Sequence, residues 1–282
     1  KKIFNSKNYI DMAKKKNQII LIKNFFVKKI IEEKNSIKIF SDNEKIIECN
    51  KLYIATGSIN TAKILLNSFT KIKKLYIKET SLILSIWLSM KKLKVLEFLG
   101  GCYKYITNIN KNPFHVQIYY FNKSFINKIQ KNNNLFKRIV TLFLNKFNKY
   151  FFFTFSYLDQ NNSRILILKK EYNQYKIANL NKNLNLYYLN NIKKKLFKNN
   201  IEIFRFSGKF GFGNHYGSIF PMKKKKLNYK NSDLYGRILN FKNVHIVDSS
   251  ILSSIPISTI TYTVMANASR IADKTTLEYG KI

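Results

Sequence analysis

Short apolar runs separated by polar turns dominate the first fifty residues of the chain. Residues 18–23 and 25–30 are largely apolar, residues 36–40 alternate between apolar and polar positions, and residues 45–49 form a further short run. Runs of this length, bounded by Asn, Asp and Lys, are typical of β-strands. The pattern therefore predicts a strand-rich unit at the start of the sequence.

A strand, a tight turn and a helix follow in immediate succession. The sequence LYIATGS at residues 52–58 is an apolar strand that breaks at Gly57, and residues 60–68 have helical spacing. This succession forms the phosphate-binding corner of nucleotide-binding α/β domains. One glycine fits an ordinary turn equally well, so the corner by itself leaves both interpretations open.

The middle of the chain has a different, strongly aromatic character. Its apolar runs predict strands at residues 114–121, 150–158 and 163–170, and helical spacing predicts helices near residues 136–147 and 189–198. Aromatic side chains in such strands more often form a core than a ligand site, and burial would also protect them from aggregation. We expect an antiparallel sheet with helices packed against it, as a separate substrate-facing layer.

The last quarter combines a histidine, an acidic strand end and a helix start. His215 lies in a glycine-flanked turn, and the apolar strand at residues 244–248 ends in Asp248. A turn rich in Ser, Pro and Thr then leads into a predicted helix of small residues at 260–273. The first unpaired N–H groups of such a helix favour an anion.

The first and last segments share the nucleotide-binding pattern, so the predicted layout is discontinuous. Residues 1–78 and 208–282 would build one domain, and residues 79–207 would be inserted into it as a second domain. The predicted fold class is therefore α/β of the mixed α+β kind. It combines an incomplete dinucleotide-binding domain, whose N-terminal part is missing, with an inserted antiparallel sheet and helices.

The net charge of +36 suggests an anionic partner, but the kind of basic residue argues against nucleic acid. Only five of the 51 basic residues are arginine, the residue that best reads phosphates and base edges. The lysines are spread along the whole chain, and residues with A/T-rich codons are common throughout. A/T-rich coding therefore explains the charge better than a specific nucleic-acid surface, and membrane-surface contact has no support.

The remaining composition excludes several classes of site. Cys49 and Cys102 have no spaced partners, so we expect neither a disulfide framework nor a metal site. No apolar run is long enough to cross a bilayer, and no signal-peptide pattern is visible, which favours a cytoplasmic protein. His245 lies mid-strand and is expected to be structural, whereas His115 is expected to be structural or to line a substrate site.

Three stretches resemble the glucose–methanol–choline (GMC) family of FAD-dependent oxidoreductases, which oxidise alcohols. KLYIATGSINTAKILLNS resembles the family's second glycine motif, and NHYGSIFPM resembles its His-x-x-Gly-(Thr/Ser) turn with one residue fewer. GRILNFKNVHIVDSSILSSIPISTITYTVMANASRIAD resembles the closing signature. The resemblance covers residues 52–68 and 213–273 and implies a FAD/NAD(P)-binding-type domain that uses FAD as cofactor.

The resemblance implies roles for particular residues. Those that match cofactor-binding positions are Val27 near the adenine, Ala55, Thr56 and Gly57 in the turn beside the dinucleotide, Asp248 and Ser249 at its ribityl and pyrophosphate end, and Ile260 and Thr261 at the flavin-facing helix start. His215 matches the catalytic histidine, which takes a proton from the substrate hydroxyl. With its ordinary pKa near 6.5, histidine suits that exchange near neutral pH. The implied substrate is a small alcohol, polyol or sugar, and the sequence does not identify the electron acceptor.

Two departures from the family pattern stand out. Thr259 occupies the place of the usual second His or Asn, where it can hydrogen-bond a substrate but is a poor base. The Gly-x-Gly-x-x-Gly fingerprint is missing, so this stretch alone is not expected to hold FAD. Two alternatives therefore stay open. One is a non-catalytic or truncated remnant of the fold, and the other, less favoured, is a basic protein that binds nucleic acid or a membrane surface.

Overall fold

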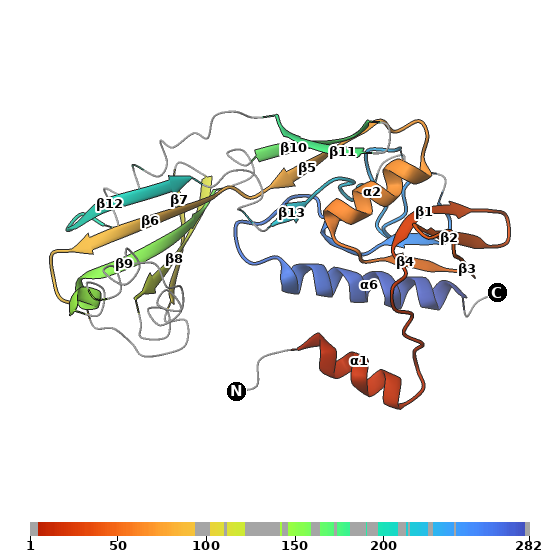
Figure 1. The fold of residues 1–282 in the computed structure, drawn as a ribbon, viewed down its shortest axis with the longest axis horizontal. Helices are drawn as coiled ribbons and strands as arrows, with labels where there is room; N and C mark the ends of the chain where they lie inside the picture. The colour runs from red at the N-terminus through yellow and green to blue at the C-terminus, as the bar shows by residue number, and fades with distance from the viewer. Residues whose placement is uncertain are drawn as a thin grey trace.

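The chain forms two lobes, and two consecutive strands make a passage from the first lobe into the second (Figure 1). The computed structural model describes residues 5–93, 102–109, 112–121, 142, 146–158, 164–171, 174–180, 190, 197–207, 213, 215–224, 228–239 and 241–279. The first lobe contains the two segments with the nucleotide-binding pattern, and the second is a sheet from the aromatic middle of the chain. β5 (Lys74–Glu79) belongs to the first lobe and leads directly into β6 (Leu82–Ser89) of the second.

The first lobe begins with an antiparallel sheet that confirms most of the predicted strands. β1 (Val27–Glu32), β2 (Ile37–Ser41) and β3 (Ile46–Cys49) pair in sequence order. The strand predicted at residues 18–23 was wrong, because this segment has no pairing partner and its side chains are exposed. The sequence did not predict α1 (Ser6–Lys15), a helix that buries no residue.

Two parallel strands and a helix make the centre of the first lobe. β4 (Leu52–Ile54) pairs with β14 (Val244–Ile246), although the two strands are far apart in sequence. α2 (Ser58–Ser68) follows β4 after the turn at Gly57, whose φ of +80° favours glycine. The strand–turn–helix corner and the C-terminal strand were both predicted.

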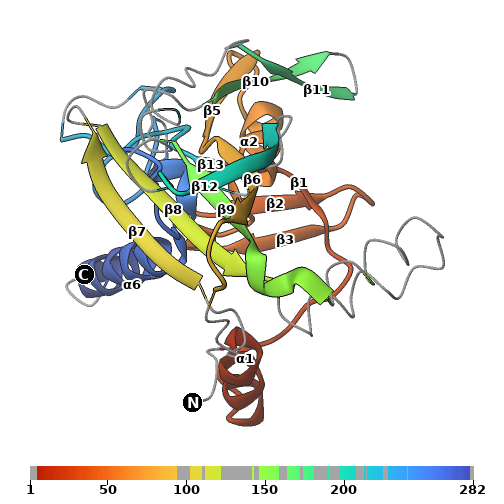
Figure 2. The same cartoon turned by 90° about the vertical axis from the view of Figure 1, so that its left-hand side faces the viewer.

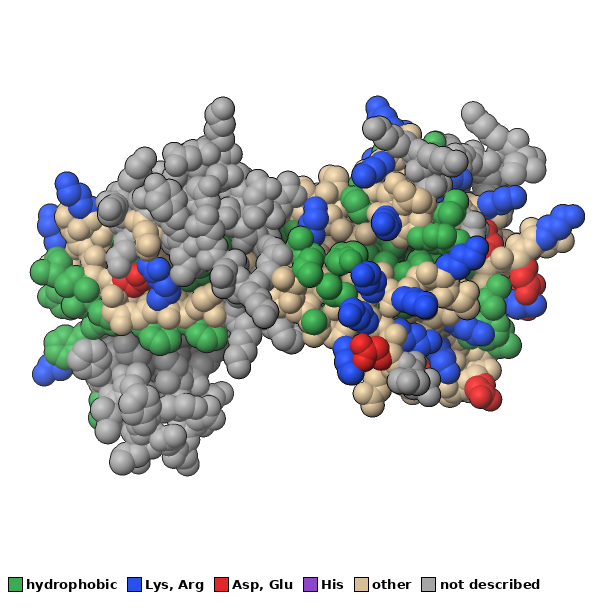
Figure 3. Space-filling view, turned by 90° about the horizontal axis from the view of Figure 1, so that it is seen from above, with side chains coloured by type: hydrophobic (Ala, Val, Ile, Leu, Met, Phe, Trp, Pro, Cys, Tyr) green, Lys and Arg blue, Asp and Glu red, His purple; other side chains and the backbone are tan. Residues whose placement is uncertain are grey.

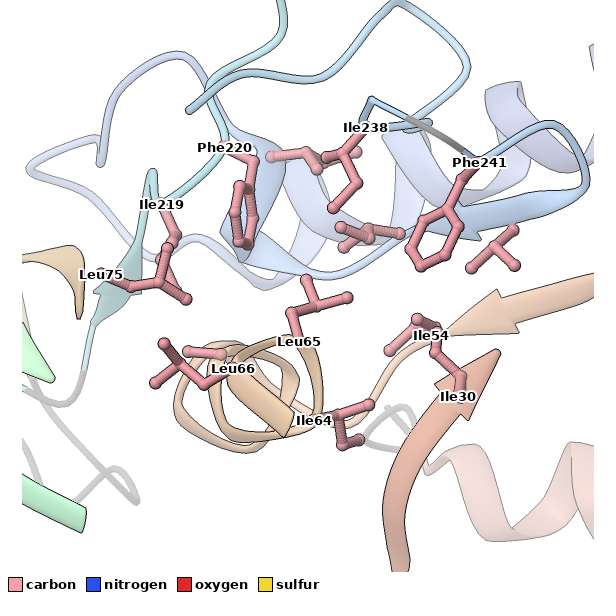
Figure 4. Packing of buried hydrophobic residues seen from close by; sticks show 14 of the residues in the cluster. Ile30, Ile54, Ile64, Leu65, Leu66, Leu75, Ile219, Phe220, Ile238 and Phe241 are labelled. Atoms are coloured by element: carbon pink, nitrogen blue, oxygen red, sulfur yellow. The ribbon is translucent and has the colours of Figure 1, made fainter. Parts of the chain in front are cut away.

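The side of α2 that faces the lobe is apolar, and its residues form the main core. Leu65 is fully buried, and Ile64 and Leu66 lie beside it against residues from the neighbouring strands and loops. Figure 4 shows these three side chains between Ile54 on one side and Phe220 on the other. This packing holds α2 against β4 and β14.

A second sheet of the first lobe has the order β11-β10-β5-β13. β10 (Arg164–Glu171) is the strand predicted at residues 163–170, and it pairs with β5 and with β11 (Gln174–Asn179). β13 (Tyr216–Gly217) pairs with the end of β5. This pairing holds the turn around His215 against the passage between the lobes.

The second lobe is an antiparallel sheet with the order β12-β6-β9-β8-β7, seen from its outer side in Figure 2. Besides β6, its strands are β7 (Cys102–Ile109), β8 (Asn112–Tyr120), β9 (Phe151–Tyr157) and β12 (Asn200–Ser207), and the short helix η1 (Asn148–Tyr150) precedes β9. The antiparallel aromatic sheet was predicted, but the strand at residues 163–170 was wrongly expected in it, because β10 pairs with β5 of the first lobe instead. The helices predicted at residues 136–147 and 189–198 lie largely outside the described residues.

The last elements return to the first lobe. The short helix η2 (Ser249–Ile251) follows β14, and α6 (Thr261–Tyr279) begins beside the second lobe and runs away from it below β4 (Figure 1). The helix predicted from residue 260 is therefore confirmed, with a later end. Both parts of the predicted nucleotide-binding unit meet in one lobe, while the domain boundaries themselves remain predictions.

Candidate functional site

β4 and β14 bring the two predicted cofactor segments to the same edge of the lobe. Leu52 pairs with Val244 and Ile54 with Ile246, and the N–H of Val247 donates to the carbonyl of Ile54 at 2.9 Å. Because the strands are parallel, their carboxyl ends lie side by side. In open α/β sheets this edge is where ligands bind.

A chain of side-chain hydrogen bonds joins the two strand ends. The Thr61 hydroxyl donates to Oδ2 of Asp248 at 2.5 Å and lies 2.8 Å from the Thr56 hydroxyl. Since the single hydroxyl proton of Thr61 goes to Asp248, Thr56 must be the donor to Thr61. The other carboxylate oxygen of Asp248 accepts from the N–H of Ser250 at 2.9 Å. Asp248 thus locks the turn after β4 to the turn after β14.

A second chain extends from this junction toward His215. The Ser58 hydroxyl, at the start of α2, donates to the carbonyl of Tyr216 at 2.9 Å and lies 2.6 Å from the Ser249 hydroxyl. Because the proton of Ser58 goes to Tyr216, Ser249 is the donor to Ser58. The two chains meet at the neighbouring residues Asp248 and Ser249, and together they connect three predicted cofactor residues (Thr56, Asp248 and Ser249) to the residue next to the predicted base.

An open cleft of about 690 Å³ lies beside this junction. Its lining includes Val27 and Thr56, two of the residues predicted to contact the cofactor. The rest of the lining is aromatic, aliphatic, basic or polar, with one carboxylate among it, and consists of Phe25, Phe26, Tyr175, Lys28, Lys63, Lys170, Asn60, Asn67, Ile64 and Asp42. An apolar and aromatic wall with a basic rim has the right chemistry for an adenosine and its phosphates.

The predicted cofactor residues differ in how accessible they are. Ala55, Thr56 and Gly57 are exposed, so the turn after β4 is open to a ligand. Asp248 and Ser249 are buried and fully engaged in the network described above. These two residues hold the turns of the site in place through their hydrogen bonds and are not exposed to a ligand.

His215 lies at the passage between the two lobes. Its carbonyl accepts from the N–H of Thr80, the residue that follows β5, at 3.0 Å. Its ring stacks on Tyr157 of β9, with centroids 5.6 Å apart and an interplanar angle of 13°. Burial lowers the pKa of His215, and the neighbouring His115 lowers it further, so the ring is neutral at neutral pH. A half-buried neutral imidazole is suited to accept a proton.

His115 belongs to the same cluster, which the sequence did not reveal. It is the register partner of Tyr157 across β8 and β9, and the two rings stack at 5.2 Å. Its Nδ1 atom lies 2.8 Å from the carbonyl of Ile257. By contrast, His245 bonds to the carbonyl of Tyr235 inside the first lobe, as a structural residue would.

Among the described residues, those predicted around the start of α6 have no hydrogen bond to His215. Thr259 is exposed, and in the described part of the chain no hydrogen bond joins it to His215. Ile260 and Thr261 open α6 as expected, since the N–H of Val264 donates to the carbonyl of Ile260 at 2.9 Å. The structure does not pair Thr259 with His215.

Replacing Thr61 by Val tests the junction between the strands. Valine has nearly the same shape as threonine but leaves the buried Asp248 oxygen without its donor, which costs about 1–3 kcal/mol. We expect this loss in the free energy of unfolding measured with urea. The Thr61→Ser control keeps the hydroxyl and should lose clearly less, so equal stability of the two variants would contradict the assigned network.

Comparison with known proteins rests on structure alone. No family model and no curated protein matches the sequence. The chain is similar in structure to a formate oxidase variant from Aspergillus oryzae RIB40, with a TM-score of 0.60 and 11% identity over 95% of this chain and 63% of the other. A FAD-dependent oxidoreductase from Chaetomium thermophilum aligns with a TM-score of 0.54 and 9% identity over 97% of this chain and 64% of the other. Pyridoxine 4-oxidase from Mesorbium loti aligns with a TM-score of 0.49 and 10% identity, over 88% of this chain and 56% of the other.

The two matches with higher scores show that the chain has the fold of FAD-dependent oxidoreductases. The chain spans 56–64% of the length of the three similar structures. Within the described ranges, no helix is both long and apolar enough to cross a membrane, and no group of metal-binding side chains is assembled. On the face seen in Figure 3, lysine and arginine side chains are distributed across the first lobe among apolar ones.

Proposed function

We propose that this protein is a FAD-dependent oxidoreductase of the GMC type that oxidises a CH–OH group. The observation that carries the proposal is the network that joins the strand ends to the histidine turn. Thr56, Asp248 and Ser249 lie on it, and Ser58 connects it to Tyr216 beside His215. The chain therefore fixes a cofactor corner and a candidate base relative to each other.

In this proposal His215 is the proton acceptor. Oxidation of an alcohol to a carbonyl removes the hydroxyl proton and a hydride from carbon, and bound FAD supplies the acceptor for that hydride. The neutral ring of His215 takes the proton, and stacking on Tyr157 holds the ring in place. A small alcohol, polyol or sugar is the proposed substrate class.

The described residues fit the adenosine side of a dinucleotide. Val27 and Tyr175 give the cleft an apolar wall, and Lys28, Lys63 and Lys170 supply charge complementary to phosphate. The resemblance assigns the start of α6 to the flavin end instead, where its first N–H groups would favour an anion. The glycine-rich turn that holds the pyrophosphate in dinucleotide-binding domains is not among these 282 residues, so they form part of the site.

Cofactor binding tests the proposal through the basic rim of the cleft. We expect the protein expressed from its complete gene to carry FAD, and Lys63→Glu with Lys170→Glu to weaken FAD binding roughly tenfold or more, since a charge-assisted contact contributes about 1.5–3 kcal/mol. Titration of the apoprotein with FAD, followed by flavin fluorescence, measures this change. The control Lys45→Glu alters an exposed lysine outside the cleft and should leave the affinity within about twofold.

Two results would count against the proposed function. If the protein binds no FAD, it keeps the fold without the cofactor. That result would favour the alternative that the protein is a non-catalytic remnant of the fold. If Lys45→Glu weakens binding as much as the double cleft variant, the effect is one of net charge alone. The cleft would then not be the site of the dinucleotide.

A further inference from the structure

Three aromatic rings from three strands or turns form one stack at the passage between the lobes. His115 on β8 and His215 before β13 both stack on Tyr157 of β9, with interplanar angles of 19° and 13°. The two histidines lie 100 positions apart in sequence. His115 is fully buried, whereas histidine is only intermediate in how often it is fully buried.

A hydrogen bond determines the tautomer of His115. The carbonyl of Ile257 can only accept, so Nδ1 of His115 must carry the proton in the 2.8 Å contact. In the neutral ring Nε2 then holds the lone pair. Ile257 belongs to the segment just before α6, two residues from Thr259. His115 thus attaches the sheet of the second lobe to the segment at the start of α6.

We propose that His115 is the second histidine of this site, a positioning residue that holds Tyr157, His215 and the segment before α6 in one arrangement. It rests on the proposed function in that His215 is the proton acceptor. The second residue of the site then comes from the second lobe, and its tautomer is fixed by the bond to Ile257, two residues from Thr259.

The charges around His215 give this arrangement a measurable signature. In the described part of the chain, the titratable groups near it are Tyr157, His115 and Glu79, whose carboxylate accepts from the N–H of Gly213 at 3.1 Å. Burial lowers the pKa of His215, and His115 lowers it by a smaller amount. Removing the imidazole of His115 should therefore move the titration of His215 up, toward the ordinary value near 6.5.

Histidine NMR reads this shift without any cofactor, because the chain has three histidines. We expect His115→Asn and His115→Phe both to raise the titration midpoint of His215, while His245→Gln, in the first lobe, leaves it unchanged. Asparagine keeps an N–H near the position of Nδ1 and so can still bond to Ile257, whereas phenylalanine keeps the ring and loses the donor. An unchanged His215 midpoint in both variants would overturn the proposal.

Alcohol-dependent flavin reduction separates positioning from simple packing. We expect His115→Phe to lower its rate on the order of tenfold to a hundredfold, the range for a displaced catalytic group, and His115→Asn to recover most of that loss. Equal rates in the Phe variant and the parent would contradict the positioning role. If the parent itself reduces no flavin, the proposed function fails, while the NMR midpoints still decide the link between the two histidines. If the Phe variant does not fold, the Asn variant and the His245→Gln control still provide that test.

Discussion

Replacing His215 by Ala lowers the rate of alcohol-dependent flavin reduction by about 10²–10⁴-fold while FAD stays bound. A positioned general base contributes a factor of this size, and a methyl group cannot accept a proton. The cofactor should be retained because the cleft and the Asp248 junction involve other side chains. Stopped-flow reduction at saturating alcohol, with the flavin content of both proteins determined first, measures the effect.

The pH dependence gives an independent check on the same residue. Burial and His115 lower the pKa of His215, so the neutral, active form persists below pH 6.5. The rate should therefore fall only as the pH drops through this lowered pKa, and stay level above it. The variant His245→Gln is the matched control, since it removes a different histidine of the first lobe, one that is buried. A loss of rate in His245→Gln equal to that in His215→Ala would remove the case for His215.

Replacing Gly217 by Ala should cost the protein about 3 kcal/mol of stability. A Cβ atom at this position would lie 2.3 Å from the carbonyl oxygen of Ser249 and 2.7 Å from Cδ1 of Ile255. Overpacking of this kind costs about 1–3 kcal/mol, and the upper end applies because the Ser249 oxygen belongs to the backbone. Urea denaturation of the variant measures the loss.

A second substitution shows which of the two contacts causes the loss of stability. Trimming Ile255 to Val in the Gly217→Ala background relieves the side-chain contact but leaves the Ser249 carbonyl in place. We expect this double variant to regain less than about 1 kcal/mol relative to the single variant. Gly217→Ala within about 0.5 kcal/mol of the parent protein would show that the histidine turn and the β14 turn are not in close contact.

Local patterns in the sequence were sufficient to predict most of the first lobe. The strands near Val27 and Ile37, the corner at Gly57 and the helix from Thr261 all carry their own signals: apolar runs of strand length, a glycine turn and helical spacing. The wrong prediction at residues 18–23 has a physical reason. Residues 18–23 have the composition of a strand but lack a partner, and pairing is a property of the whole fold.

The candidate site was predictable where its residues are close in sequence. The sequence marked His215 as a candidate by its glycine-flanked turn and Asp248 by its place at a strand end, and their roles stay predictions. The contacts of His115 could not be predicted, because they depend on the register of β8 with β9 and on a bond to Ile257, 142 positions away. Thr61 was missed for the same reason, since its partner Asp248 is 187 positions away.

The most direct test of the proposed function is the absorbance of the bound flavin under anaerobic conditions after an alcohol is added. We predict that a panel of small alcohols, polyols and sugars contains a substrate that bleaches the flavin in the parent protein. With that substrate, His215→Ala should bleach about 10²–10⁴-fold more slowly. Equal bleaching rates in the two proteins, or a bound flavin that no alcohol in the panel reduces, would contradict the proposal that this is an alcohol-oxidising flavoenzyme with His215 as its base.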